Sequence, residues 1–432
     1  MHRTTILFVL PFFPFPVESG GHMALLNGII AIKDDLDVTL AFPVDDREKY
    51  ERAKNSFLKI VPNACLIPLF NEKHIITIPD PEYPVWYRML SRFKVFIRKK
   101  IKKSGSEPII YEHHPEIQMC LGWISSVSPL GKAWLEHIAK ICSEYHFDII
   151  QVEIPWLFSQ ILTLPEGPSK ICVHHEVGFV RRELEQIQYP YSEYIKACKA
   201  YTDIMEIGLL NKYDAVITLS IIDRQKLKDH GVKVPVFSSF ATVNTPPKSL
   251  PETIDGKHLV FVGPEGHTPN FIGITWFLEN CWASLLSKDR NYRLSIIGNW
   301  SKEYIAEYTS KYPNINFLGY VNNLVDTIRG TVMIIPITVG SGIRMKILDA
   351  CSIGVPFVST TIGAEGIPVV DGETCYIADT PDLFVKKILK LQDSAIQKIF
   401  IKNAYDMIVD NYSIDALRKN RLAIYKEILR QN

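Results

Sequence analysis

Residues 340–356 read GSGIRMKILDACSIGVP and bring glycines, two cations and a carboxylate to the start of an amphipathic helix. The apolar run VMIIPI at 332–337 comes just before it, so the pattern predicts a buried strand, a glycine loop and a helix that ends at Gly354. A helix N-terminus carries free N–H donors and a partial positive charge, and acidic side chains normally populate its first turn. Arg344 and Lys346 instead add two full positive charges there. This arrangement indicates a site for an anion, best a phosphate or diphosphate.

A simpler interpretation of the same residues is a surface ion pair. Lys346 and Asp349 are three positions apart, a spacing that contributes only about 0.2 to 0.5 kcal/mol to an isolated helix. This interpretation leaves Arg344 and the glycines without a role, so we favour the anion site.

The elements that must position this loop are short apolar runs that alternate with helical periods. Because the runs lack strict alternation, they suit strands covered on both faces, and two parallel α/β sheets in tandem follow from their order. The runs are TILFVL (5–10), VTLAF (38–42), DIIQVE (148–153), KICVHH (170–175) and AVITLS (215–220), then HLVFVG (258–263), RLSIIG (293–298), INFLG (315–319), VMIIPI (332–337), PFVST (356–360) and CYIAD (375–379). Ligands of such sheets bind beyond the carboxyl ends of the strands.

Length and composition are those of a soluble two-domain protein. The chain has 432 residues, a formal net charge of +1 and 8 scattered cysteines. The near-neutral charge argues against nucleic acid as a partner, and the cysteines, with no C-x-x-C pair, indicate buried reduced thiols rather than a zinc site. We interpret the apolar N-terminal stretch as a strand and glycine loop rather than a signal peptide. No apolar stretch reaches the roughly 20 residues of a membrane-spanning helix.

Candidate residues in the first half also follow strands. Gly20 and Gly21 precede an expected helix near His22, so their N–H groups could approach a phosphate, although a tight turn needs glycines equally. His174 and His175 end a strand, and neighbours on a strand point to opposite faces, so the pair cannot readily chelate one metal ion. No metal site is therefore predicted.

The motifs of both halves together resemble glycosyltransferase family 4, in the branch with G-x-G-x-R-x-K-I-L-[DE]. The specific part covers most of 258–367 and includes FVG, the PN pair at 269–270, FLGYV (317–321) and the run from 340 to 367. Looser matches are QVE (151–153), HHEVGFVRRE (174–183) and YDAVITLS (213–220). The resemblance implies a GT-B fold, with two Rossmann-like domains facing a central cleft and a C-terminal helix crossing back. It also implies transfer of a sugar from a nucleotide donor with retention of configuration.

The resemblance assigns roles to single residues. Arg344 and Lys346 would hold the donor diphosphate and stabilise it as it leaves, and His175 would face the donor sugar, with Glu176 as the second choice. Asp349 stands where the family has a glutamate and would bond the donor ribose. The other donor-binding candidates are Gly20, Gly21, Gly263, Gly340, Ser341 and Gly342.

Two positions depart from the pattern of many relatives. Ser341 replaces the first glutamate of an E-x7-E pair, and the loop after Gly263 has no basic residue. His267 lies in that loop, and we interpret it as a solvated loop histidine. Glu153 ends another strand, but sequence alone places no matching carboxylate for acid–base work.

The proposed boundaries are residues 1–242 for an N-terminal, acceptor-side Rossmann-like domain and a proline-rich linker at 243–256. A nucleotide-sugar-binding domain at 257–405 and a C-terminal helix at 406–432 that packs toward the first domain complete the chain.

A basic amphipathic pattern, RFKVFIRKKIKK, occupies residues 92–103. Two interpretations stay open: contact with an anionic membrane surface or lipid-linked acceptor, and an ordinary solvated helix packed on the sheet. The residues concerned are Arg92, Lys94, Arg98, Lys99 and Lys102. The protein is expected to be cytoplasmic, and the first interpretation would place it on the inner face of the membrane.

The function that follows is a retaining glycosyltransferase. It would move a sugar from a UDP- or GDP-sugar to a glycan or lipid-linked acceptor in cell-envelope or exopolysaccharide assembly, with no cofactor required. An NDP-sugar epimerase of related fold is one alternative, although no pair of carboxylates suited to it stands out. A non-catalytic subunit that binds nucleotide or glycan is the other, made conceivable by Ser341 and by the missing basic residue after FVG.

Overall fold

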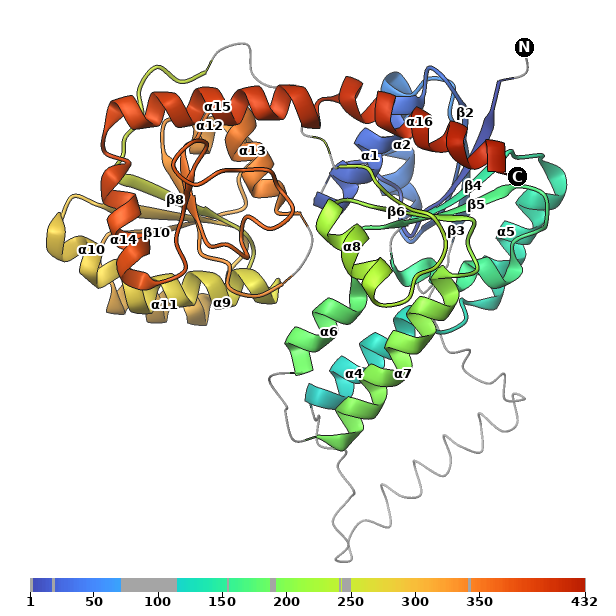
Figure 1. The fold of residues 1–432 in the computed structure, drawn as a ribbon, viewed down its shortest axis with the longest axis horizontal. Helices are drawn as coiled ribbons and strands as arrows, with labels where there is room; N and C mark the ends of the chain where they lie inside the picture. The colour runs from blue at the N-terminus through green and yellow to red at the C-terminus, as the bar shows by residue number, and fades with distance from the viewer. Residues whose placement is uncertain are drawn as a thin grey trace, which may run out of the picture.

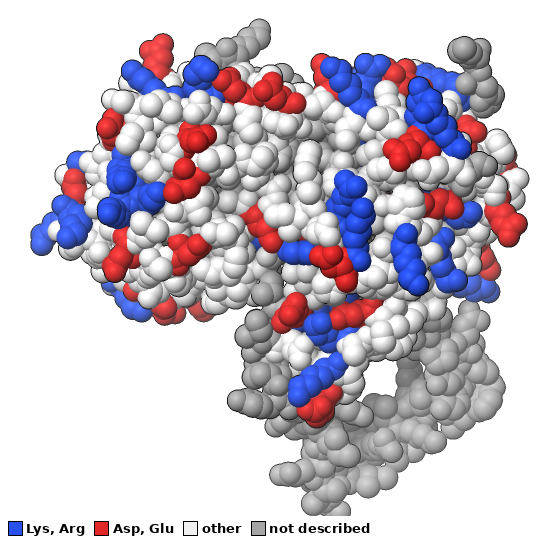
Figure 2. All heavy atoms as spheres, viewed as in Figure 1, with Lys and Arg blue, Asp and Glu red and all other residues white. Residues whose placement is uncertain are grey.

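The structure is a computed structural model in which two α/β lobes lie side by side and one long helical stretch runs across both (Figure 1). It describes residues 3–17, 20–70, 115–153, 155–186, 192–240, 242, 250–340 and 343–431. The residues of the basic pattern at 92–103, and Ser341 and Gly342, lie outside the described residues. On the face drawn in Figure 2, cationic and anionic side chains are interspersed, as the net charge of +1 predicts.

The first lobe contains a seven-stranded parallel sheet of order β3-β2-β1-β4-β5-β6-β7. Its strands are β1 (Thr5–Val9), β2 (Asp37–Val44), β3 (Cys65–Phe70), β4 (Ile149–Glu153), β5 (Ser169–His174), β6 (Ala215–Thr218) and β7 (Val236–Ser238). Its helices are α1 (Gly20–Ile32), α2 (Arg47–Ile60), α4 (Pro115–Val127), α5 (Lys132–Glu144), η1 (Pro155–Thr163), α6 (Gly178–Gln186), α7 (Glu193–Leu210) and α8 (Ile221–Asp229). The strand order reverses at β1, so β1 and β4 flank the switch point at which open sheets bind ligands.

The second lobe contains a six-stranded parallel sheet of order β10-β9-β8-β11-β12-β13. Its strands are β8 (His258–Val262), β9 (Arg293–Ile297), β10 (Ile315–Gly319), β11 (Val332–Ile335), β12 (Phe357–Ser359) and β13 (Tyr376–Ile377). Its helices are α9 (Thr268–Phe277), η2 (Leu278–Trp282), α10 (Ala283–Lys288), α11 (Lys302–Lys311), α12 (Leu324–Ile328), α13 (Met345–Ile353), α14 (Pro381–Lys390) and α15 (Ser394–Tyr412), after which α16 (Ile414–Gln431) ends the described chain.

Every predicted apolar run coincides with a strand, so the two tandem parallel sheets are confirmed. The apolar runs of the sequence do not predict β3 and β7, which form the two edges of the first sheet. An edge strand has a partner on one side only and can tolerate a residue such as Pro68, which weakens its pattern in the sequence.

The C-terminal helix crosses back, as expected, because its apolar face belongs to the core of the first lobe. Leu417, Ile424, Tyr425 and Ile428 are buried in that core, and α16 packs against α1. At its surface, the Arg418 guanidinium donates two hydrogen bonds of 2.6 and 2.7 Å to the carboxylate of Asp35. The two lobes are therefore coupled through α15 and α16.

Helix α13 follows β11 and a glycine loop, as the sequence predicts, and ends at Gly354, which adopts the left-handed conformation with a φ of 79°. The cysteines fit the expectation of buried thiols less well, because Cys65 is exposed and Cys142 is only half-buried. In the described ranges, no helix combines the length and the apolar character needed to cross a bilayer.

Candidate active site

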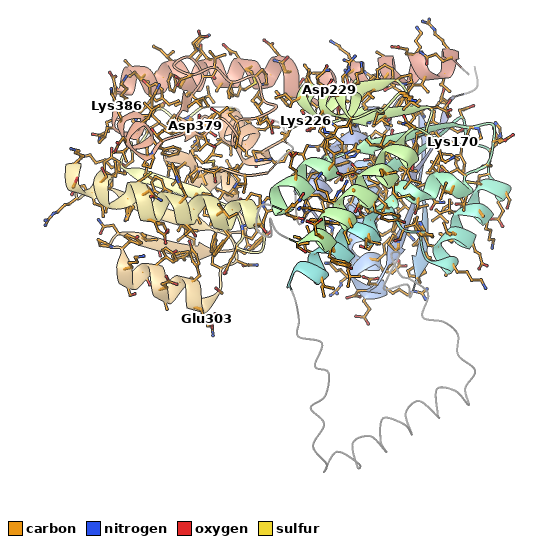
Figure 3. The ribbon with its side chains drawn as sticks, turned by 60° about the horizontal axis from the view of Figure 1, so that its bottom comes forward. Lys170, Lys226, Asp229, Glu303, Asp379 and Lys386 are labelled. Atoms are coloured by element: carbon orange, nitrogen blue, oxygen red, sulfur yellow. The ribbon has the colours of Figure 1, made fainter. Side chains whose placement is uncertain are left out.

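The carboxyl ends of the two sheets face each other where the lobes meet, and three contacts join them there. Met345, the first residue of α13, lies so close to Gly20 that a Cβ on Gly20 would come within 3.1 Å of the Met345 Cγ. A Cβ on Gly366 would similarly meet the Ser220 Cβ at 3.0 Å. Lys226 in α8, which lies at the junction of the lobes in Figure 3, forms a 2.8 Å ion pair with Glu365. These contacts mark the junction of the lobes, and the space between the two sheet edges beside them is called the cleft below.

Arg344 is the N-cap residue of α13 and is only 8% exposed. Burial lowers the pKa of its guanidinium, and the carboxylates of Glu365, Glu176 and Asp223 act in the opposite direction. Two of these carboxylates belong to the first lobe, so Arg344 lies in an electrostatic field made by both halves of the cleft. The guanidinium remains charged, because even a lowered arginine pKa lies far above neutrality.

Glycines allow the backbone to pass close to this arginine. Gly340 has a φ of 113°, and a Cβ there would lie 3.1 Å from both the Arg344 Nη2 and the Pro269 Cγ. Any other residue would be strained by that φ and would crowd both neighbours. Gly340 therefore leaves space for the Arg344 side chain, and this explains why a glycine occupies this position of the sequence motif.

Lys346 extends from α13 toward Asn270 in α9. Its Nζ donates a 2.8 Å hydrogen bond to the Asn270 Oδ1 and lies 4.6 Å from the centre of the Phe261 ring. Burial, and then the charge of Arg344, lowers the pKa of Lys346 to about 7. Since its hydrogen-bond partner is a neutral amide, an anion in the cleft would stabilise its charged form.

Asn270, which holds Lys346, is itself positioned by a glycine. Its Nδ2 donates to the Pro264 carbonyl oxygen at 3.2 Å, and a Cβ on Gly263 would overlap the Asn270 amide at 2.4 Å. Gly263 therefore makes room for the asparagine, which in the sequence is recognised only as part of the PN pair of the motif. The signal that could have identified Asn270 is its position at the start of α9, opposite the glycine loop.

His267, the N-cap residue of α9, has an exposed side chain, as the solvated-loop interpretation requires. Its environment is nevertheless strongly positive: protein atoms around the ring remove part of its hydration, and this desolvation, followed by the charges of Lys346, Arg344 and Arg181, lowers its pKa to about 4. The imidazole is therefore neutral at physiological pH, and it marks the rim of the cationic site.

Asp349 lies one turn beyond Lys346 on α13. Burial raises the pKa of its carboxyl to about 6, and within the described part of the chain no hydrogen bond to this carboxylate is formed. Lys346 bonds to Asn270 instead, so the surface ion pair considered from the sequence is not what the lysine forms. Asp349 is thus a polar group able to accept hydrogen bonds from a ligand.

His175, the first residue after β5, has a side chain that is only 13% exposed, and its Nε2 lies 2.7 Å from the Glu153 Oε2 at the end of β4. The Glu153 Oε1 accepts a 2.5 Å hydrogen bond from the Gln151 Nε2, and the Gln151 Oε1 accepts a 2.6 Å hydrogen bond from the hydroxyl of Tyr425 in α16. His175 and Glu153 are both candidates from the sequence, but their place at strand ends does not predict this chain of hydrogen bonds.

His174 points to the opposite side of the sheet, as the alternation along a strand requires. Its Nε2 lies 3.0 Å from the Glu206 Oε1, which also accepts from the Gly178 backbone N–H at 3.1 Å. Arg182 pairs with Glu206 and with Asp203, so this buried network fixes the loop that carries His175. Within the described ranges, no group of three or more His, Cys, Asp or Glu side chains could hold a metal ion.

The structure thus gathers most of the predicted residues at one cleft. Arg344, Lys346, Gly340 and Gly263 lie on the second lobe, while Gly20 and Gly21 begin α1 on the first. Glu176, the second choice after His175, is close enough to Arg181 and Arg344 for both charges to lower its pKa, although burial raises the pKa overall.

Comparisons with known proteins agree with this arrangement. Residues 256–394 match the family model of Glycosyl transferases group 1. A protein of Klebsiella pneumoniae described as an uncharacterized 44.6 kDa protein in the cps region is 29% identical over 185 residues, which are 39% of this chain and 45% of that protein. The chain is therefore matched to less than half of the relative's length.

Similar solved structures cover the whole chain. Sucrose-phosphate synthase from Thermosynechococcus elongatus has a TM-score of 0.68 and 13% identity, with 100% of both chains covered. TarM of S. aureus, in complex with Fondaparinux, alpha-GlcNAc-glycerol and UDP, has a TM-score of 0.65 and 14% identity, covering 98% of this chain and 99% of that one. Anabaena Alr3699/HepE in complex with UDP has a TM-score of 0.62 and 10% identity, covering 98% and 100%. The chain has the GT-B fold, and its second sheet lies within a segment that matches Glycosyl transferases group 1.

Proposed function

We propose that the protein is a retaining, metal-independent glycosyltransferase of the family 4 type that transfers a hexose from a nucleotide-sugar donor to a glycan acceptor. The observation that carries the proposal is a pair of cations, the buried Arg344 and the half-buried Lys346, at the N-terminus of α13. The first turn of this helix has no acidic residue, and burial lowers the pKa values of both Arg344 and Lys346. A diphosphate at this helix end would stabilise both charged forms.

The same arrangement provides the main stabilisation that the transfer needs. When the bond between the sugar and the diphosphate breaks, the electron pair goes to the diphosphate oxygen, where negative charge accumulates. Arg344, Lys346 and the N-terminal end of α13 would stabilise the negative charge that develops on this oxygen. Preorganised cations of this kind can supply electrostatic stabilisation without a divalent ion.

His175 would act on the sugar side of the cleft. Its Nε2 hydrogen bond to Glu153 orients the ring, so its other face or its backbone can contact the donor sugar. Asp349 would accept hydrogen bonds from the ribose, and Gly20, Gly21, Ser341 and Gly342 would allow the backbone to approach the donor.

The choice of donor and biological setting rests on proteins with similar structures or sequences. Alr3699/HepE has been solved with UDP and with UDP-glucose, which supports a UDP-sugar over a GDP-sugar. The cps-region relative supports a place in polysaccharide assembly. A lipid-linked acceptor, and membrane contact through residues 92–103 on the cytoplasmic side, remain part of the proposal.

Calorimetric titration tests the donor site directly. UDP, GDP and ADP are titrated into the protein with and without EDTA, and into Arg344→Ala. We expect UDP to bind equally with EDTA and Arg344→Ala to weaken binding by about 1.5 to 3 kcal/mol, the usual contribution of a hydrogen bond to a charged group. Arg329→Ala is the matched control, because Arg329 is the C-cap residue of α12 and precedes β11, whereas α13 begins after the carboxyl end of that strand.

A second assay separates an enzyme from a binding subunit. The wild-type protein is incubated with UDP-glucose, UDP-galactose and UDP-N-acetylglucosamine, and release of UDP is measured without an acceptor. An enzyme hydrolyses one of these donors slowly, and Arg344→Ala should reduce that rate. Binding of UDP without any turnover, with or without an acceptor extract, would instead favour the non-catalytic alternative.

A further inference from the structure

A separate cavity of about 370 Å³ opens in the first lobe beside the proposed donor site. It lies beyond the carboxyl ends of β1 and β2, between the segment that leads into α1 and the start of α2. Its volume falls within the roughly 300 to 1,000 Å³ of small-molecule pockets. None of the roles assigned to Arg344, Lys346 or His175 uses this cavity.

The wall of the cavity is aromatic and held in place. Phe12 and His22 stack with ring centres 4.2 Å apart and planes inclined by 25°. Phe13 is fixed behind them by Phe42, Tyr50 and Phe57, with ring centres 4.8, 5.2 and 5.1 Å away. The wall is therefore preorganised and presents aromatic surface to a ligand.

Polar groups stand at the edge of the same cavity. Asp45, Asp46 and Lys49 line it, and the Asp46 carboxylate also accepts the Lys49 backbone N–H at 2.9 Å as the cap of α2. Tyr50 also lines it, and burial raises the pKa of its hydroxyl to about 12, so the hydroxyl remains protonated and can donate a hydrogen bond. Aromatic surface combined with carboxylates and a hydroxyl suits a sugar ring, which presents C–H faces and many hydroxyl groups.

The cavity is connected to the donor site through packing. Phe12, Phe15, Ile343 and Met345 all pack against the same apolar core, although the last two belong to the second lobe. His22 of the cavity wall is two positions from Gly20, the residue that contacts Met345 at the start of α13. A ligand in the cavity would thus lie next to the helix end proposed to hold the diphosphate.

We propose that this cavity, lined by Phe12, Phe15, His22, Asp45, Lys49 and Tyr50, binds an uncharged sugar residue of the acceptor. That the sugar belongs to the acceptor rests on the proposed function. That the cavity binds a sugar rests on the residues that line it. Two carboxylates against one ammonium disfavour an acidic sugar, because its carboxylate would face Asp45 and Asp46. The site therefore selects a neutral hexose unit over a uronic acid.

Saturation-transfer difference NMR on the full chain tests the proposal, with methyl α-glucoside, methyl α-galactoside and methyl α-glucuronide as probes. We expect at least one neutral glycoside to receive saturation and the glucuronide to receive about fivefold less. Phe12→Ala should reduce the signal about fivefold through loss of ring contact. Tyr201→Ala, which removes an exposed aromatic ring of α7 outside the cavity, should leave it unchanged.

Asp45→Asn guards against a folding defect in the phenylalanine variant, because Asp45 is exposed. Asp45→Asn should reduce the difference in saturation-transfer signal between methyl α-glucoside and methyl α-glucuronide. Saturation of no glycoside, or equal signals in wild type, Phe12→Ala and Asp45→Asn, would overturn the proposal. UDP affinity in Phe12→Ala should stay within about twofold of wild type, because Phe12 is not among the residues assigned to the donor. Sugar binding without UDP binding would refute the proposed function alone, and UDP binding without sugar binding would refute this inference alone.

Discussion

The imidazole of His175 and the carboxylate of Glu153 meet at the carboxyl ends of two adjacent strands, with Nε2 and Oε2 2.7 Å apart. Glu153 is 4% exposed and is held in turn by Gln151, which accepts a hydrogen bond from Tyr425. The side chain proposed to face the donor sugar is therefore oriented from the C-terminal helix. Helix α16 thus both packs on the core of the first lobe and contributes to the orientation of His175.

Glu153→Gln should slow hydrolysis of the donor about tenfold while leaving UDP affinity within about twofold of wild type. The amide keeps the size of the side chain but loses the charge-assisted hydrogen bond, worth roughly 1.5 to 3 kcal/mol, that fixes one ring tautomer. Steady-state kinetics separates kcat from KM, and ¹⁵N chemical shifts of the histidine report the tautomer. An unchanged tautomer and rate would show that Glu153 only packs.

Tyr425→Phe removes the outermost hydroxyl of the same chain. We expect a smaller loss of rate than for Glu153→Gln and a loss of roughly 0.5 to 1.5 kcal/mol in the free energy of unfolding, typical of one hydrogen bond. Urea denaturation measures the latter. If Tyr425→Phe slowed the reaction more than Glu153→Gln, its role would lie in closure rather than in orientation of His175.

Donor affinity should depend on pH through Lys346. Its pKa is lowered to about 7 in the free protein, and a bound diphosphate would raise it, so binding takes up a proton above pH 7. Affinity for UDP-glucose should therefore rise as pH falls from about 9 to about 7 and then level off. The pKa values of His267, about 4, and Asp349, about 6, lie below this window. Calorimetry in two buffers of different ionisation enthalpy measures the proton uptake.

Lys346→Arg provides the control for that experiment. An arginine stays charged throughout the range, so the variant should bind UDP-glucose with an affinity that is nearly independent of pH between 7 and 9. The same slope in Lys346→Arg and wild type would assign the titration to another group.

The ion pair of Lys226 and Glu365 should bias the two lobes toward the closed arrangement by a small amount. Both side chains retain about a quarter of their exposure, 26% and 25%, so the pair is worth only about 0.2 to 1 kcal/mol. Lys226→Glu should lower UDP affinity a few-fold and increase the radius of gyration in solution scattering. The double variant Lys226→Glu, Glu365→Lys should restore both, and failure of the double variant to do so would show that the pair is incidental.

Docking of α16 should contribute strongly to stability. Ile424 is 5% exposed in the core of the first lobe, and truncation of a buried isoleucine typically costs about 2 to 5 kcal/mol. Ile424→Ala should therefore lower the free energy of unfolding of the first lobe in urea by that amount. Ile399→Ala is matched in chemistry, but Ile399 is 54% exposed on α15, so it should change stability by no more than about 0.5 kcal/mol. Equal effects would mean that α16 is not part of the cooperative unit.

The sequence predicted the elements more completely than the contacts between them. Buried parallel strands are continuous apolar runs, so the positions of most strands along the chain could be predicted from residues that are neighbours in the sequence. A glycine loop before a helix also has a local signature, and the end of α13 at Gly354 could be predicted in the same way. The edge strands β3 and β7 were missed because half of an edge strand's environment is solvent.

By itself, the sequence determined two parallel sheets, a cationic glycine loop at the start of a helix and the separation of His174 from His175. Only the tertiary structure decided that Lys346 lies on Asn270, that Glu153 and Tyr425 are linked to His175, and that Phe12 and His22 wall a cavity. The physical reason is that these relationships join side chains far apart in the chain. Their distances and burial, which set the pKa values and the shape of the site, exist only after the sheets have packed.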